Sequence, residues 1–252
     1  MLLAIDAGNT NITVGLFDAS KLASHWRLET QNISDESWNK FLQSIPKFRD
    51  VILSNVVPSI QSLLQKGIVH YGGKDPLVVT PKTAQIPLRV DHPEEVGADR
   101  LCNAVAAWEK WKQATIVVDF GTATTLDIIT AAGEYGGGAI VPGPSTAAKA
   151  LSQSTAQLPI VEFAKPKHIV GRNTEECIQA GLYYGYVGMV DHLIRLSQKE
   201  EGCPMKVVAT GGLAASIAEE SKMIEVVEPH LTLEGLNFIW QRNVVIPAKA
   251  GI

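Results

Sequence analysis

Short apolar runs separated by polar turns fill the first third of the chain. Most have the length and alternation of strands, and Pro58 ends the fourth of these strand-like runs. Two intervening segments show helical spacing instead, the first of them weakly. The expected elements, in order, are strands over 2–6, 12–17 and 22–28, a helix over 35–45, a strand over 51–57, a helix over 58–70 and a strand over 77–80.

Residues 81–98 interrupt this pattern, because they are rich in proline and charge, and they predict a loop. A helix is expected next, since apolar residues recur at helical spacing. These residues are Leu101, Ala104, Val105, Trp108 and Trp111. The helix closes the first of two expected domains, which spans 1–112.

The second expected domain spans 113–252 and opens, like the first, on strands. The expected elements are strands from about 114 to 120, over 126–130 and over 138–141, a bend at 142–144, a helix over 173–197, a strand over 206–210 and a helix over 213–221. Residues 222–252 are poorly specified, and their apolar end fits either a last strand or a frayed tail. The fold class predicted is α/β, with two tandem RNase H-like domains and the active-site cleft between them.

The helix over 173–197 has a clear beginning and an unusual interior. Asn173 and Glu176 fit a capping box at its start. Gly181, Gly185 and Gly188 follow one another along the helix, where each glycine costs about 1 kcal/mol. We therefore expect another backbone to pass close to them, and we favour packing within the chain over a subunit interface.

Composition excludes several classes of protein. The 252 residues are 46% hydrophobic and 19% charged, which is typical of a globular protein with substantial cores. The net charge of −4 and the scattered Lys and Arg residues disfavour binding to nucleic acid. No apolar window is long enough to span a membrane, and the first residues lack a basic signal region.

The cysteines indicate a reducing compartment. Cys102, Cys177 and Cys203 are odd in number and too widely spaced for a disulfide framework or a metal site. His168, His192 and His230 show no ligand spacing either. We expect the protein in the cytoplasm.

The most informative feature is a turn that occurs twice. Residues 3–13 (LAIDAGNTNIT) and 116–125 (IVVDFGTATT) each run from a buried strand into an aspartate, a glycine and a cluster of hydroxyl or amide side chains. The aspartates, Asp6 and Asp119, lie 113 positions apart, which is the length of a domain. A single such turn could be a plain hairpin, but two of them favour a nucleotide site.

Phosphate and metal chemistry explain these residue types. Gly8 permits a positive φ and lets backbone N–H groups approach a polyphosphate closely. Asp6 is placed to orient a hydrated Mg²⁺, which takes only one or two carboxylates. A Walker-type loop is absent from the sequence, since Gly73-Lys74 is followed by Asp75-Pro76.

A third polar group lies at the start of the expected helix after the proline-rich loop. In Gly97-Ala98-Asp99-Arg100, Asp99 is either a helix N-cap or a general base, and Arg100 is either solvated or an anion-binding group. Spacing alone favours the N-cap interpretation.

Taken in order, these motifs resemble a known family. DAGNTNITVGLFD, EEVGADR, VVDFGTATT, GRNT and ATGG, spread over about residues 1–213, are similar to the motif set of type III pantothenate kinases. These kinases are members of the actin/hexokinase/Hsp70-type phosphotransferase superfamily. The resemblance implies transfer of phosphate from ATP to pantothenate, the first step of coenzyme A biosynthesis, by a homodimer.

The resemblance also implies roles for individual residues. Asp99 would be the catalytic base, and pantothenate would be held by Gly97, Ala98, Asp99, Arg100 and Thr174. ATP would be bound by Asp6, Ala7, Gly8, Asn9, Thr10, Asn11, Ile12, Thr13, Thr122, Gly211 and Gly212. Asp119 would coordinate a monovalent cation, K⁺ or NH₄⁺, and Asp6 would lie near Mg²⁺.

One position departs from the family pattern. Many members carry an aromatic residue in the loop before the GADR motif, whereas this chain has Val90. A substitute contact would come from Tyr183, Tyr184 or Tyr186. Two alternative functions stay open: an accessory transcriptional regulator of the same family, and a kinase or hydrolase of the same fold acting on another substrate.

Overall fold

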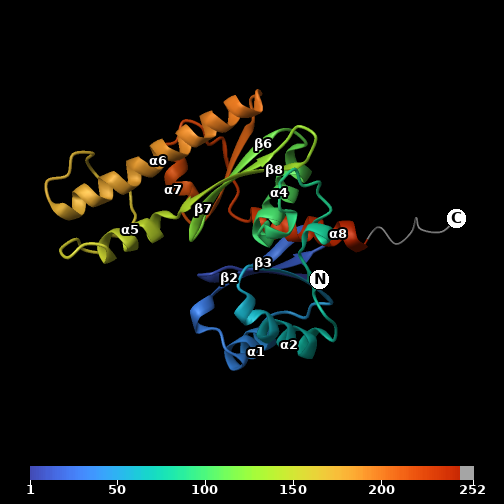
Figure 1. The fold of residues 1–252 in the computed structure, drawn as a ribbon. Coiled ribbons are helices and arrows are strands. Elements are labelled where there is room, and N and C mark those ends of the chain that lie inside the picture. The colour runs from blue at the N-terminus through green and yellow to red at the C-terminus, as the bar shows by residue number, and fades with distance from the viewer. Residues whose placement is uncertain (245–252) are drawn as a thin grey trace. The chain divides into compact units, whose positions relative to one another are not determined.

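The computed structural model describes residues 1–244. The chain forms two compact units, the first made of residues 1–110 together with the last helix and the second of residues 111–230 (Figure 1). None of the helices in this described part combines the length and the apolar character needed to cross a bilayer.

The first unit is built on a mixed sheet of five strands. Its strands are β1 (Leu2–Ala7), β2 (Asn11–Asp18), β3 (Lys21–Glu29), β4 (Asp50–Asn55) and β5 (Leu77–Val78), in the order β3-β2-β1-β4-β5. The first three strands form an antiparallel meander, and β4 and β5 continue the sheet in parallel with β1. This is the strand order of an RNase H-like domain, as the sequence predicts.

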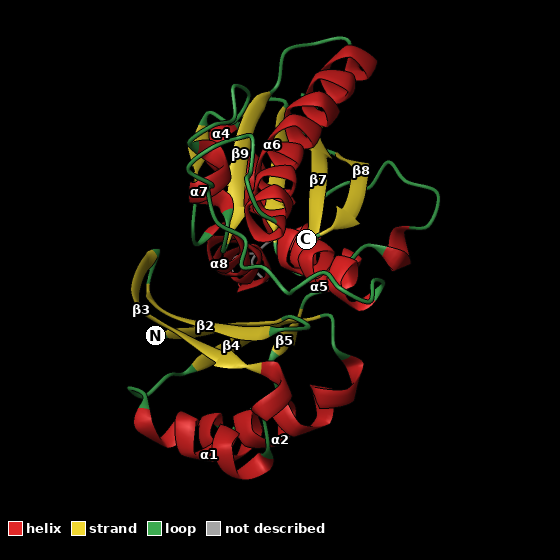
Figure 2. Ribbon diagram, turned by 90° about the vertical axis from the view of Figure 1, so that its left-hand side faces the viewer, coloured by secondary structure: helices red, strands yellow, loops and turns green. Residues whose placement is uncertain are grey.

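Helices cover both faces of this sheet (Figure 2). α1 (Asp35–Ser44) and α2 (Gln61–Gly72) lie on one face, and α8 (Leu231–Val244) lies on the other. Alternate residues of β1, such as Ile5, enter the core beneath α1 and α2. The two helices pack closely because Gly67 has no side chain: a Cβ there would lie 2.5 Å from Cδ1 of the buried Trp38.

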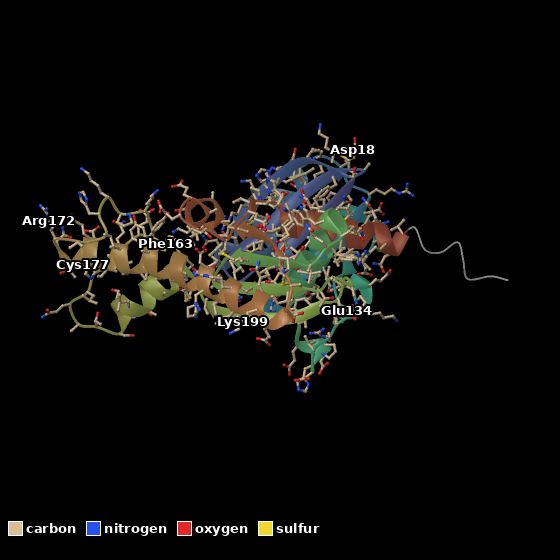
Figure 3. All side chains as sticks on the ribbon, turned by 90° about the horizontal axis from the view of Figure 1, so that it is seen from above. Asp18, Glu134, Phe163, Arg172, Cys177 and Lys199 are labelled. Atoms are coloured by element: carbon tan, nitrogen blue, oxygen red, sulfur yellow. The ribbon has the colours of Figure 1, made fainter. Side chains whose placement is uncertain are left out.

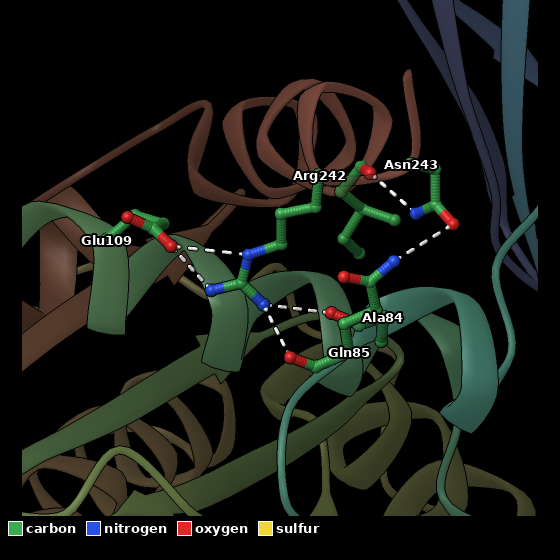
Figure 4. Close-up of polar contacts among 6 residues, drawn as sticks. Ala84, Gln85, Glu109, Arg242 and Asn243 are labelled. Carbon is green, nitrogen blue, oxygen red and sulfur yellow. Dashed lines mark hydrogen bonds and ion pairs between the residues drawn. The ribbon is translucent and has the colours of Figure 1, made fainter. Parts of the chain in front are cut away.

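α8 also forms hydrogen bonds to α3 (Pro81–Ala84), to the residue after it and to α4 (Ala98–Trp111). Arg242 donates from Nε (3.2 Å) and Nη2 (2.5 Å) to Glu109 on α4, and from Nη1 to the carbonyls of Ala84 (2.9 Å) and Gln85 (3.0 Å) (Figure 4). Asn243 donates to the carbonyl of Thr83 at 2.7 Å. The end of the described chain therefore fixes two segments of the first unit.

The second unit repeats the same architecture. Its strands are β6 (Thr115–Phe120), β7 (Ala123–Ile129), β8 (Tyr135–Pro142), β9 (Lys206–Gly211) and β10 (Val226–Val227), in the order β8-β7-β6-β9-β10. Again the first three strands are antiparallel and the last two parallel to the first. The duplication inferred from the two turns is thus a duplication of sheet topology.

Three helices belong to the second unit: α5 (Pro144–Gln153), α6 (Thr174–Glu201) and α7 (Ala214–Ala218). α6 packs its buried tyrosines and valines against the apolar face of β6, together with α7. Asn173 caps α6 by accepting from the backbone N–H of Glu176 at 2.9 Å, while the Glu176 carboxylate accepts from the N–H of Arg172 at 2.8 Å.

Several expected elements differ in the structure. The segment 81–98 contains two short helices, α3 and a 3₁₀ turn at Pro93–Glu95, and not only loop. Pro81 begins α3, where a missing N–H costs no hydrogen bond. α5 follows the expected bend at 142–144, and its first residue is again a proline, Pro144. Two further 3₁₀ turns lie at Thr30–Asn32 and Pro58–Ile60.

The C-terminal part differs most from its expectation. Residues 231–244 form a helix of the first unit, so the expected domain over 113–252 departs from the compact unit, which ends at 230. The expected strand or frayed tail over 243–252 lies, beyond Val244, outside the described residues. The favoured packing of the chain's own backbone against the α6 glycines is wrong for residues 1–244, since a Cβ at Gly181, Gly185 or Gly188 would meet nothing within 4 Å.

Candidate active site

A hydrogen bond closes the turn between β1 and β2, and Thr30, which lies outside the turn, fixes its shape. The N–H of Gly8 donates to the carbonyl of Asn11 at 3.0 Å. Thr30, which follows β3, donates its hydroxyl to the carbonyl of Gly8 at 2.7 Å and its N–H to that of Thr10 at 3.0 Å. Asn9 and Thr10 remain exposed at the tip. These hydrogen bonds fix the shape of the turn and leave the side chains at its tip exposed.

Asp6 stands one residue before the end of β1, on the sheet face opposite the α1 and α2 core. Its partner across the parallel pair with β4 is Ser54, whose hydroxyl donates to Oδ1 of Asp6 at 2.9 Å. The neighbouring Ala7 and Ile12 are fully buried, main chain included, and belong to the core.

Asp99 is the second residue of α4 and not its N-cap. Its carboxylate accepts from the backbone N–H of Arg100 at 2.8 Å. Burial raises the pKa of Asp99, while this N–H and the charge of Arg100 oppose the shift. A half-buried carboxyl with a raised pKa is a better proton acceptor than an exposed one, as a general base requires.

A buried thiol lies within electrostatic range of Asp6 and Asp99. Cys102 lies one turn after Asp99 on α4 and is fully buried. Burial raises its pKa well above the usual range, and the charges of Asp6 and Asp99 raise it further. Cys102 is therefore a buried, protonated thiol within electrostatic range of both Asp6 and Asp99.

The corresponding turn of the second unit joins β6 to β7. The N–H of Gly121 donates to the carbonyl of Ala123 at 3.0 Å. The carbonyl of Thr122 accepts from the N–H of Gly143 at 2.9 Å and from the hydroxyl of Thr146 at 2.7 Å, both at the beginning of α5. α5 therefore supports this turn as Thr30 supports the first one.

Asp119 occupies in β6 the place that Asp6 occupies in β1. Across the parallel pair with β9 its partner is Thr210, and Gly211 follows with a φ of +91°. A Cβ at Gly211 would lie 2.6 Å from both Oδ1 of Asp119 and the carbonyl oxygen of Phe120. The glycine is required here by backbone conformation and by space.

Thr174 is exposed at the beginning of α6, and Figure 3 shows Arg172 and Cys177 near the same end of this helix, with Lys199 near the other. Val90 is half-buried in the loop before α4. Of the tyrosines expected to replace an aromatic at this position, Tyr183 and Tyr186 are buried. Their hydroxyls donate to the carbonyls of Ser216 and Pro142. Tyr183 and Tyr186 therefore belong to the core of the second unit.

The donor atoms suit hard cations. Asp6 and Ser54 present only oxygen, which fits a Mg²⁺ that takes one carboxylate and completes its shell with water and phosphate. Asp119 stands beside main-chain carbonyls, which fits a monovalent cation. Within residues 1–244, no group of three or more His, Cys, Asp or Glu side chains is arranged to hold a metal ion.

Sequence reasoning missed three supporting residues: Thr30, Ser54 and Thr146. Each is distant in sequence from the group it contacts, at separations of 22, 48 and 24 positions. Of the three, only Ser54 could have been noticed in the sequence, because it is a polar residue within the apolar run 51–57.

Two units of one strand order, each with an aspartate one residue before the end of its first strand and a glycine turn after it, define an α/β protein built from two related domains. The model of the type III pantothenate kinase family matches residues 2–196. The chain is 49% identical to a type III pantothenate kinase from Myxococcus xanthus, over 96% of this chain and 99% of the relative. It is 45% identical to one from Geobacter sulfurreducens over the same shares. The chain belongs to the type III pantothenate kinase family.

Among solved structures, a Campylobacter jejuni protein described as a member of the Baf family of transcriptional activators is similar in fold. It has a TM-score of 0.60 and 20% identity, over 96% of this chain and 98% of that chain. At this identity the likeness shows the fold alone.

Proposed function

We propose that this chain transfers the γ-phosphoryl group of ATP to the primary hydroxyl of pantothenate, giving 4′-phosphopantothenate, the first step of coenzyme A biosynthesis. The observation that carries this proposal is the near-complete match to type III pantothenate kinases at 45 to 49% identity. The regulatory alternative has only a fold likeness behind it.

Asp99 is the base in this reaction. The hydroxyl oxygen of pantothenate bonds to the γ-phosphorus, the bond from that phosphorus to the bridging oxygen of ADP breaks, and the hydroxyl proton passes to the Asp99 carboxylate. Its raised pKa favours this transfer. We assign Gly97, Ala98, Arg100 and Thr174 to pantothenate, with Arg100 as the group for its carboxylate.

The β1–β2 turn binds phosphate. The exposed residues at its tip, Asn9 and Thr10, would supply donors to phosphate, and Thr30 holds the shape of the turn. Asp6 would hold Mg²⁺, which when bound neutralises phosphate charge. In the second unit we assign Thr122, Gly211 and Gly212 to ATP, and Asp119 to K⁺ or NH₄⁺.

We further propose a cytoplasmic homodimer. The three cysteines are free thiols, as in a reducing compartment. The α6 glycines leave open space along the helix, which would let a second copy of α6 approach closely. Light scattering of the purified chain should give the mass of a dimer, and Gly185→Arg should give a monomer. A wild-type monomer would remove the dimer from the proposal.

Release of ADP in a coupled assay tests the activity. Pantothenate should stimulate release, whereas glucose, glycerol and buffer alone should not. Equal release with any of these acceptors would contradict the assignment of pantothenate as substrate. Binding to duplex DNA at low salt, without pantothenate-dependent release, would favour the regulatory alternative.

A further inference from the structure

A buried carboxylate of the second unit accepts two hydroxyl groups and has no part in the proposed reaction. Asp127 lies on β7 and is fully buried. Its Oδ1 accepts from the hydroxyl of Tyr135 at 2.9 Å, and its Oδ2 accepts from the hydroxyl of Thr125 at 3.0 Å. Burial of a carboxylate costs free energy, and its hydrogen bonds need not offset the whole cost. Stability alone therefore does not account for an aspartate at this position.

The strand register places Thr125 beside Asp119. The two residues lie directly opposite each other in the antiparallel pair of β6 and β7. Their side chains therefore project from the same face of the sheet, with Cβ atoms about 4.5 to 5.5 Å apart. Val118 and Phe120, the neighbours of Asp119, enter the core beneath α6, so Asp119 and Thr125 lie on the opposite face. Both are only half-buried, so a small ion can reach them.

The contact with Asp127 determines what the Thr125 oxygen can offer to a ligand. A hydroxyl group has one proton and two lone pairs. Thr125 donates its proton to Asp127, so its oxygen can present only lone pairs on the side of Asp119. The ionised carboxylate of Asp119 is also an acceptor and not a donor. Two neighbouring oxygen acceptors are stabilised by a positive charge between them.

An irregularity of the sheet brings the second hydroxyl to Asp127. The β7–β8 register shifts between Asp127 and Ile129, as at a β-bulge, which can redirect a side chain. Gly138, opposite Asp127, has a φ of +155°, and a Cβ there would lie 1.7 Å from the carbonyl oxygen of Leu126. Only glycine allows this close approach of the two strands. Within it the buried Tyr135 reaches Asp127 and fixes its carboxylate.

We infer that Thr125 is a ligand of the monovalent cation proposed at Asp119, and that Asp127 is a positioning residue that turns the Thr125 oxygen toward this cation. The two oxygens suit either candidate ion. K⁺ exchanges its water for neutral oxygen ligands, and NH₄⁺ would find two hydrogen-bond acceptors. This inference rests on the proposed cation site of Asp119.

Cation binding tests the role of Thr125 without turnover. The melting temperature of the chain is followed against the concentration of KCl, with choline chloride keeping the ionic strength constant, MgADP present and pantothenate absent. The concentration dependence gives an apparent Kd for K⁺. Thr125→Val has a similar shape but no oxygen, and it should raise this Kd about tenfold or more. Thr125→Ser keeps the hydroxyl and should stay near the wild-type value. A wild-type Kd in Thr125→Val would remove Thr125 from the site.

A double-mutant cycle tests the role of Asp127. Asp127→Asn should raise the Kd for K⁺ about tenfold, because the amide can donate to Thr125 and release its proton. Loss of negative charge would also weaken cation binding, so the same change is made in the Thr125→Val chain. If Asp127 acts through Thr125, Asp127→Asn should have no further effect there. An equal rise of the Kd in both chains would overturn the positioning role.

A matched control separates positioning from stability. Asp191 is a buried aspartate on α6, and its carboxylate accepts from the hydroxyl of Ser221 at 2.5 Å and from the N–H of Lys222 at 3.0 Å. Asp191→Asn should lower the melting temperature but leave the Kd for K⁺ unchanged. A rise equal to that of Asp127→Asn would contradict the inference.

The wild-type chain separates this inference from the proposed activity. If K⁺ does not raise its melting temperature above that in choline, the cation site of Asp119 is wrong and the role of Thr125 falls with it. Failure of the proposed function would show instead as ADP release that ignores pantothenate, with K⁺ binding and its dependence on Thr125 intact.

Discussion

The carboxylate of Asp99 occupies space beside Gly97 that is free because Gly97 has no side chain. A Cβ at position 97 would lie 2.6 Å from Oδ1 of Asp99, well inside van der Waals contact. The carboxylate uses that space to accept the N–H of Arg100 at 2.8 Å. The Asp99 carboxylate can therefore take this position only because residue 97 of the GADR motif is a glycine.

Gly97→Ala should displace the base while keeping the fold. We expect kcat to fall between about tenfold and a hundredfold, the cost of misplacing a reacting group by about 1 Å. Gly136→Ala is the matched control, because its Cβ would make only ordinary contacts of 3.4 to 3.6 Å. Steady-state kinetics decide the outcome, and equal kcat values for the two variants would refute this role of Gly97.

The pH dependence of the reaction should report on Asp99. Its pKa is raised by burial, so the base gains its charge at higher pH than an ordinary aspartate does. The acidic limb of kcat/KM should therefore lie above the usual aspartate range. Because the charge of Arg100 lowers this pKa, Arg100→Gln should move the limb to still higher pH. A limb that moves to lower pH in Arg100→Gln would contradict the assignment.

The monovalent cation should act through Asp119. Turnover of the wild-type chain should be higher in K⁺ or NH₄⁺ than in Na⁺ at equal ionic strength. Asp119→Ala should be slow and indifferent to the cation, because the carboxylate beside the Gly211 main chain is lost. If the wild-type chain turns over equally in K⁺ and Na⁺, the assignment of Asp119 is wrong.

Arg242 should contribute to stability more than to chemistry. Arg242→Met removes the contacts to Glu109, Ala84 and Gln85 and leaves these acceptors partly buried. We expect a loss of about 2 kcal/mol and a fall in melting temperature on the order of 5 °C. Arg242→Lys, which keeps the charge but loses the planar fork, should recover only part of it. An unchanged melting temperature in Arg242→Met would show that the contacts add no net stability.

The sequence predicted the elements whose apolar residues recur at a simple spacing. The strands that end at Asp6 and Asp119 were evident because buried β runs are apolar and stop at a polar residue. α8 was not predicted, since it is buried on more than one side, including Leu233, Gly235 and Asn237, and so lacks a single apolar stripe. The bend predicted at 142–144 overlaps only the first residue of α5, and no helix was predicted over 145–153.

The residues of the candidate site also fall into those that local sequence predicts and those that it does not. Motif residues such as Asp99 could be assigned from resemblance, because local sequence carries them. Ser54 and Thr30 could not, since their role depends on strand register and on contacts between distant segments. The open space at Gly185 likewise depends on what the rest of the chain leaves uncovered.

Formation of 4′-phosphopantothenate by the wild-type chain and by Asp99→Asn tests the central claim most directly. Both proteins are first matched by circular dichroism, and the product is then followed by mass spectrometry in the presence of ATP, Mg²⁺ and K⁺. We expect product from the wild-type chain and a rate lower by about a hundredfold to ten-thousandfold in Asp99→Asn. A near-normal rate in the variant, or no phosphorylated pantothenate from the wild-type chain, would contradict the account.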